Sequence, residues 1–84
     1  MGALAGKTAI VTGAGTGIGR AIASVLAEEG ARLVLAGRRR ARLEDTARLV
    51  AGFGGLAHVV PTDVTDEAQV TALFAEASRF APTL

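Results

Sequence analysis

A glycine cluster at residues 12–19, with the sequence TGAGTGIG, is the feature that most constrains the fold of this chain. It lies between a short apolar run at residues 7–12 and a stretch whose apolar residues recur at helical spacing. An apolar run of this length, ended by glycines, is typical of a strand buried on both faces. Because glycine lets the backbone turn sharply, the segment predicts a strand, a tight loop and a helix in succession.

The same alternation recurs twice more along the chain. Residues 33–36 and 57–60 are predicted strands, ended by Gly37 and Pro61, and the first two helices are expected to stop near Gly30 and Gly52. Thr65 is the predicted cap of the third helix, with Asp66 and Glu67 in its first turn. The residues expected to face the core are Ile18, Ala21, Ile22, Val25 and Leu26 in the first helix, Leu43, Ala47 and Val50 in the second, and Val70, Leu73, Phe74 and Ala77 in the third.

The order strand–helix, repeated three times, predicts an α/β fold with a parallel sheet and right-handed crossovers. It corresponds to the N-terminal βαβαβα half of a Rossmann-type doubly wound sheet. The strands are expected in the order 3-2-1, which leaves the first strand at an edge that would be central in a complete sheet. An unpaired apolar edge favours association, so we expect the isolated chain to be marginally stable or to self-associate.

The composition fits a soluble globular chain and excludes several function classes. The chain has 84 residues, half of them apolar, and a formal net charge of +1, which gives no reason to expect nucleic acid or an anionic membrane as a partner. It has no cysteine and no cluster of metal ligands, so no disulfide or metal site is expected. With no signal peptide, acylation signal or apolar run of about 18 residues, the expected location is cytoplasmic.

The glycine loop has a chemical interpretation as well as a structural one. The first N–H groups of a helix lack internal partners, and the helix dipole adds partial positive charge there. A nucleotide pyrophosphate can therefore bind where glycines let the backbone approach it. The spacing is Gly13-x-x-x-Gly17-x-Gly19, which differs from the usual Gly-x-Gly-x-x-Gly fingerprint, and a purely structural turn is the alternative. Gly6-Lys7-Thr8 resembles the end of a P-loop, but it precedes the strand and is rejected.

The end of the second predicted strand carries Gly37, Arg38 and Arg39. In dinucleotide folds an acidic residue near this place often binds the adenine ribose hydroxyls. Here no carboxylate is present, and a guanidinium can instead bind a 2′-phosphate. The sequence therefore predicts NADP as the cofactor in preference to NAD. The alternative is that these arginines are solvated, which is the favoured interpretation for Arg40 and Arg42.

His58 and the three phenylalanines are assigned structural roles. His58 alternates with apolar neighbours and has no second metal-ligand candidate beside it. The phenylalanines, Phe53, Phe74 and Phe80, are expected to pack in the interior instead of stacking on a ligand.

With these residues in hand, the chain resembles the classical short-chain dehydrogenase/reductase family from residue 6 to residue 84. The residues Thr12, Gly13, Gly17, Ile18 and Gly19 match the spacing of that family's cofactor motif, and Asp63-Val64 resembles a second signature. The resemblance implies that Asp63 and Val64 contact the adenine and that Thr16 lies near the adenosine ribose or its 2′-phosphate. The cofactor-binding residues so expected are Gly13, Gly15, Thr16, Gly17, Ile18, Gly19, Arg38, Arg39, Asp63 and Val64.

The resemblance also implies an enzyme that transfers hydride between NADP(H) and a small carbonyl or alcohol substrate, as a homo-oligomer in its full-length form. The family's catalytic residues are a Ser and a Tyr-x-x-x-Lys pair beyond a fourth strand. This sequence has no tyrosine, and none of Lys7, Ser24 and Ser78 can be assigned such a role. Residues 1–84 are therefore expected to be a partial dinucleotide-binding domain without catalytic residues, inactive alone. A non-catalytic nucleotide-binding module and a non-functional truncated product are the alternatives.

Overall fold

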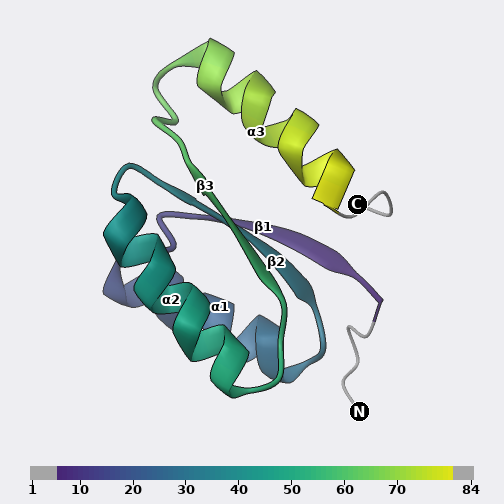
Figure 1. The fold of residues 1–84 in the computed structure, drawn as a ribbon. Coiled ribbons are helices and arrows are strands. Elements are labelled where there is room, and N and C mark those ends of the chain that lie inside the picture. The colour runs from purple at the N-terminus through teal and green to yellow at the C-terminus, as the bar shows by residue number, and fades with distance from the viewer. Residues whose placement is uncertain (1–5, 81–84) are drawn as a thin grey trace.

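The computed structural model describes residues 6–80 and confirms the predicted alternation of strands and helices (Figure 1). The N-terminal residues 1–5, where no signal peptide is expected, lie outside this range. In chain order the elements are β1 (Thr8–Thr12), α1 (Gly17–Glu28), β2 (Arg32–Gly37), α2 (Arg40–Gly52), β3 (Ala57–Pro61) and α3 (Glu67–Phe80). No helix in the described range has the length and apolar character needed to cross a membrane.

The three strands form one parallel sheet in the order β1-β2-β3, as predicted. Val34 of β2 pairs with Ile10 on one side and with His58 on the other. Figure 1 shows α1 and α2 on one face of the sheet and α3 on the opposite face. The central strand β2 is buried from both sides, because Leu33 and Leu35 pack under α1 and α2 while Val34 and Ala36 pack under α3. This explains its unbroken apolar sequence.

The predicted core face of α1 is wrong apart from Leu26, which is partly buried and packs against the core. The large apolar residues Ile18, Ile22 and Val25 are 78%, 48% and 60% exposed, and the buried face is made by three small residues. These residues are Gly19, Ala23 and Ala27, spaced four apart. The glycine loop fixes the angle at which the chain enters the helix, and small side chains let the helix lie close to the sheet. The large residues therefore point away from β2.

The predicted cap of α3 is also wrong. Asp66 caps this helix, since its Oδ1 accepts hydrogen bonds from the backbone N–H groups of Ala68 at 3.0 Å and Gln69 at 3.4 Å. Thr65 instead donates its hydroxyl to Asp63 at 2.6 Å. Asp is as good a cap as Thr, and the turn that Thr65 makes with Asp63 starts the helix one residue later.

The aromatic residues are less buried than predicted, whereas His58 has a structural contact. Phe53 and Phe74 are 48% and 55% exposed, so neither packs in the interior of the described part. The side chain of Phe80 is not described. His58 Nε2 on β3 lies 3.0 Å from Glu76 Oε2 on α3, which links strand and helix at a half-buried position.

Candidate functional site

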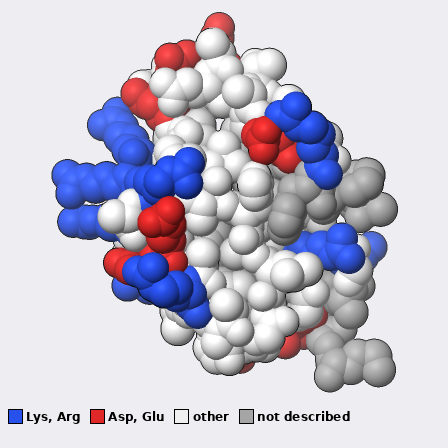
Figure 2. All heavy atoms as spheres, viewed as in Figure 1, with Lys and Arg blue, Asp and Glu red and all other residues white. Residues whose placement is uncertain are grey.

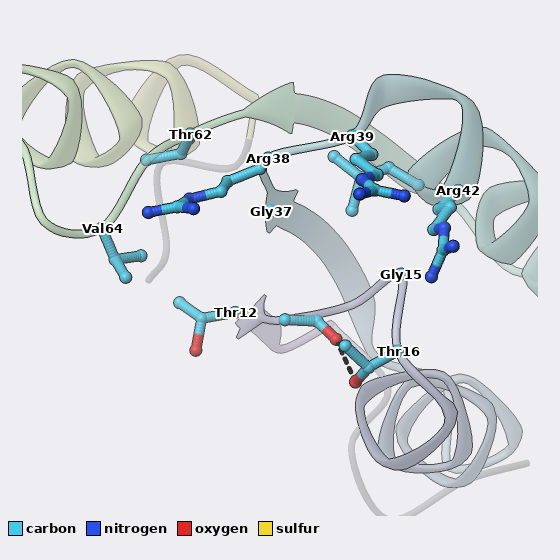
Figure 3. A pocket seen from close by; sticks show the side chains of 11 residues that line it. Thr12, Gly15, Thr16, Gly37, Arg38, Arg39, Arg42, Thr62 and Val64 are labelled. Atoms are coloured by element: carbon cyan, nitrogen blue, oxygen red, sulfur yellow. Dashed lines mark hydrogen bonds between the residues drawn. The ribbon is translucent and has the colours of Figure 1, made fainter.

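A pocket of about 390 Å³ lies where the carboxyl ends of the three strands meet the glycine loop (Figure 3). Each strand contributes a residue at or just after its end: Thr12 from β1, Gly37 from β2 and Thr62 beyond β3. In open parallel sheets the crevice outside the carboxyl ends of the strands is where ligands bind. The remaining lining residues are Gly13, Gly15, Thr16, Arg38, Arg39, Arg42, Leu43 and Val64.

Thr16 organises the turn from β1 into α1. Its hydroxyl donates to the carbonyl of Gly13 at 2.7 Å and accepts from the N–H of Gly19 at 3.1 Å, so it caps the helix. The backbone N–H of Thr16 also bonds to the Gly13 carbonyl, at 3.0 Å. Gly13 has φ of +63°, a conformation that residues with a side chain rarely adopt. The turn is therefore closed by its own hydrogen bonds.

Three of the four loop glycines are required by the fold itself. Besides Gly13, a Cβ on Gly19 would lie 2.0 Å from the Gly13 carbonyl oxygen, and a Cβ on Gly15 would lie 2.7 Å from Arg42 Cβ. Gly17 differs, since a Cβ there would meet nothing within 4 Å in the described part of the chain. The packing of the protein therefore does not explain the glycine at position 17.

The first turn of α1 presents backbone donors that the protein does not use. Within the described residues, the N–H groups of Ala14, Thr16 and Gly19 have acceptors, but those of Gly17 and Ile18 have none. Such donors at a helix start, together with the helix dipole, attract an anion. The open space beside Gly17 is on the same turn.

One group of basic side chains lies over the start of α2, at the left edge of the view in Figure 2, and others lie at the right of the view. Arg38 Nη2 lies 3.4 Å from Asp63 Oδ1 across the mouth of the pocket, and both side chains are exposed. Figure 3 shows Arg39 and Arg42 above the glycine loop, on the opposite side from Arg38. No acidic side chain in the described residues pairs with Arg39 or Arg42. Arg40 points elsewhere and pairs with Glu44 at 3.7 Å.

Asp63 holds the turn between β3 and α3. Its Oδ1 accepts from the hydroxyl of Thr65 at 2.6 Å and from the Thr65 N–H at 3.0 Å, and its own N–H donates to Gln69 Oε1 at 2.7 Å. The two hydrogen bonds from Thr65, with a smaller contribution from the Arg38 charge, hold the pKa of the Asp63 carboxyl below its usual 3.8. The carboxylate is therefore ionised at neutral pH.

This depressed pKa predicts a contribution to stability that acid removes. The folded state favours the ionised form of Asp63, so the contribution is complete above the ordinary pKa of 3.8 and is lost as pH falls through the lower folded value. Urea midpoints measured at pH 5 and pH 3 should fall less in Asp63→Asn than in the wild type. Glu28→Gln, at an exposed site far from this turn, is the control and should match the wild type. An equal fall in all three proteins would contradict the prediction.

The structure brings together six of the ten residues expected to bind a cofactor. Those that line the pocket are Gly13, Gly15, Thr16, Arg38, Arg39 and Val64. Gly17, Ile18 and Gly19 lie in the adjoining first turn of α1, and the Ile18 side chain points to solvent. Asp63 is at the rim, beside Arg38.

Several pocket residues were missed by reasoning from the sequence. Arg42, assigned to solvent, lines the pocket because it lies one helical turn beyond Arg39, a spacing of three residues that could have indicated a shared face. Thr62 also lines it, as does Thr12, which was named in the family's motif but not among the expected cofactor-binding residues. The rule that ligands bind at the carboxyl ends of parallel strands could have identified both.

Comparisons with known proteins agree with this fold. The profile of the short chain dehydrogenase family matches residues 7–83, so the chain belongs to that family of oxidoreductases. An uncharacterized oxidoreductase of Staphylococcus aureus strain N315 is 51% identical over 73 residues, which are 87% of this chain and 31% of that protein.

Two solved structures are also similar. A metagenomic short-chain oxidoreductase in complex with NADP superposes with a TM-score of 0.89 at 34% identity, covering 94% of this chain and 36% of that one. An NAD⁺-bound xylitol dehydrogenase superposes with a TM-score of 0.92 at 36% identity, covering 95% and 31%. The chain thus spans about a third of the length of the relatives it matches.

Proposed function

We propose that residues 1–84 are the part of a short-chain dehydrogenase/reductase that binds the adenosine and pyrophosphate of NADP. The observation that carries the proposal is a pocket at the carboxyl ends of a parallel sheet that is lined by three arginines and adjoins a helix turn with unused N–H groups. The protein that contains this chain would then transfer hydride between NADP(H) and a carbonyl or alcohol substrate.

The pyrophosphate subsite is the first turn of α1. The N–H groups of Gly17 and Ile18 have no acceptor in the described structure, and no side chain occupies the space where a Cβ of Gly17 would point. Gly17 is therefore the one loop glycine that the packing of the described residues does not require to be glycine. Close approach of a phosphate to the backbone explains it.

The 2′-phosphate subsite is the group formed by Arg38, Arg39 and Arg42. Gly37 stands where a carboxylate would favour NAD, so nothing at the end of β2 repels a phosphate. Arg39 and Arg42 have no acidic partner in the described residues, which leaves their guanidinium groups for a ligand. Charge-assisted hydrogen bonds from arginine suit a phosphate with three acceptor oxygens.

The adenine subsite is the turn after β3. Val64 is 57% exposed and lines the pocket, so it offers an apolar surface to a ring. All hydrogen bonds accepted by the Asp63 carboxylate fall on Oδ1, which leaves Oδ2 for an adenine amino group.

The chemistry of the reaction lies outside these subsites. When bound, the dinucleotide supplies the hydride donor or acceptor at its nicotinamide ring, while the residues named here hold and orient its other half. In doubly wound sheets a dinucleotide extends across the point where strand order reverses, beyond the free edge of β1. The catalytic Ser, Tyr and Lys of the family have no counterpart in residues 1–84, so this chain alone should bind without turnover.

The proposal is tested by titrating NADP and NAD into the wild type and Arg38→Ala by calorimetry. Arg38→Ala should lower the affinity for NADP about tenfold to a hundredfold, and leave NAD nearly unchanged, because one or two charge-assisted bonds to the 2′-phosphate are lost. Arg40→Ala is the matched control, since Arg40 pairs with Glu44 and does not line the pocket. Equal losses for both cofactors in Arg38→Ala would refute the 2′-phosphate subsite. A wild type that binds neither dinucleotide would refute the function, leaving a chain without nucleotide binding.

A further inference from the structure

Thr46 is a fully buried polar residue on α2 that faces the glycine loop, not solvent. Its hydroxyl donates to the carbonyl oxygen of Ala14 at 2.7 Å, a contact between residues 32 positions apart in the sequence. The carbonyl of Arg42, one turn back along α2, lies farther away at 3.2 Å. A hydroxyl has one proton to donate, and the shorter distance assigns it to Ala14.

Arg20 on α1 completes this contact. Its Nε donates to the Thr46 hydroxyl oxygen at 3.2 Å, so the hydroxyl both accepts from α1 and donates to the loop. The Thr46 side chain thus joins three segments: the start of α1, the middle of α2 and the loop between β1 and α1.

Ala14 lies at the centre of that loop, and both its N–H and its carbonyl group are hydrogen-bonded. Its N–H donates to the Ala36 carbonyl at the end of β2 at 3.1 Å, while its carbonyl accepts from Thr46. Ala14 is completely buried, so water cannot replace either bond. The flanking glycines, Gly13 and Gly15, are the joints about which an unanchored peptide would rotate.

We propose that Thr46 is a positioning residue for the pyrophosphate subsite, an inference that rests on the proposed function. By fixing the Ala14 carbonyl, its hydroxyl sets the path of the loop into α1 and so the direction of the N–H groups of Gly17 and Ile18. Packing alone would be satisfied by an apolar residue at this fully buried position. A buried hydroxyl is costly unless it is bonded, and here its bonds go to the loop that borders the ligand.

The test compares Thr46→Val, which keeps the shape but not the hydroxyl, with Thr46→Ser, which keeps the hydroxyl. Calorimetric affinities of the whole protein for NADP, NAD and adenosine 2′-monophosphate are measured at a temperature at which circular dichroism shows all variants folded. Thr46→Val should bind NADP and NAD about threefold to tenfold more weakly, by the same factor, because a net hydrogen bond is lost. Thr46→Ser should bind like the wild type, and adenosine 2′-monophosphate, which has no pyrophosphate, should bind equally to all.

Several results would overturn the inference while leaving the proposed function intact. One is a Thr46→Val affinity equal to that of the wild type, and another is a Thr46→Ser affinity as weak as that of Thr46→Val. A loss that extends to adenosine 2′-monophosphate, or one that affects NADP but not NAD, would also overturn it, because Thr46 would then act through Arg42, whose carbonyl it also approaches. A wild type that binds no dinucleotide would instead overturn the proposed function together with this inference.

Discussion

Gly19→Ala should destabilise the fold and abolish dinucleotide binding. The added methyl group would lie 2.0 Å from the Gly13 carbonyl oxygen and 2.9 Å from Ala14 Cα, and both neighbours are backbone atoms that a side-chain rotation cannot move. Overpacking of this kind costs about 1–3 kcal/mol in the free energy of unfolding, a fall in Tm on the order of 10 °C for a domain of this size. Thermal unfolding followed by circular dichroism measures the loss.

Gly17→Ala is the matched control, two residues earlier in the same turn. Its methyl group would enter open space, and the first helical position gains from alanine, so stability should be unchanged or slightly higher. Binding should nevertheless fall about tenfold or more, because the methyl group occupies the space assigned to the pyrophosphate. Stability unaffected in Gly19→Ala would contradict the close approach of helix and loop. Undiminished binding in Gly17→Ala would contradict the pyrophosphate subsite.

The 84-residue chain produced by itself should self-associate at micromolar concentration. The outer edge of β1 has no partner strand in the described residues, so its backbone groups can pair with another chain. The outer face of α1 also exposes Ile18, Ile22 and Val25. A shallow hollow of about 260 Å³ continues this apolar face, lined by Ala21, Ile22, Val25 and Leu26. Burial of each large apolar side chain contributes about 1.5–3 kcal/mol, enough to favour association.

Sedimentation velocity over a range of concentrations measures this association. The double variant Ile22→Lys/Val25→Glu should raise the dissociation constant about tenfold or more, since two apolar contacts are replaced by charges. Leu49→Lys is the control: Leu49 is 39% exposed on α2 and does not line the hollow, so its replacement should change little. A sharp, concentration-independent unfolding of a monomeric wild type would contradict the prediction.

The order of elements and the glycine loop could be predicted because they depend on local patterns. Apolar runs of four to six residues, helical spacing between them and glycines at the junctions specify alternating strands and helices, and the structure reproduces all six. Gly30 and Gly54, which follow α1 and α2 with φ of +91° and +79°, show how local conformational freedom ends a helix. Arg38 could be placed near the pocket because it follows the second strand, and the carboxyl ends of parallel strands meet at one edge of the sheet.

The orientation of each element was decided by the tertiary structure. Periodicity gives the spacing of apolar residues on a helix but not which side faces the sheet. In α1 three small residues face the sheet instead of three large ones, because the loop brings the helix close to the sheet. The contacts of Arg42 with the pocket and of Thr46 with Ala14 join segments that are far apart in the sequence. Short-range patterns in the sequence are thus enough to predict the kind of fold and the region of the candidate site. Only the packed structure decided which side chains border the site and hold it, because those contacts depend on the angles between elements.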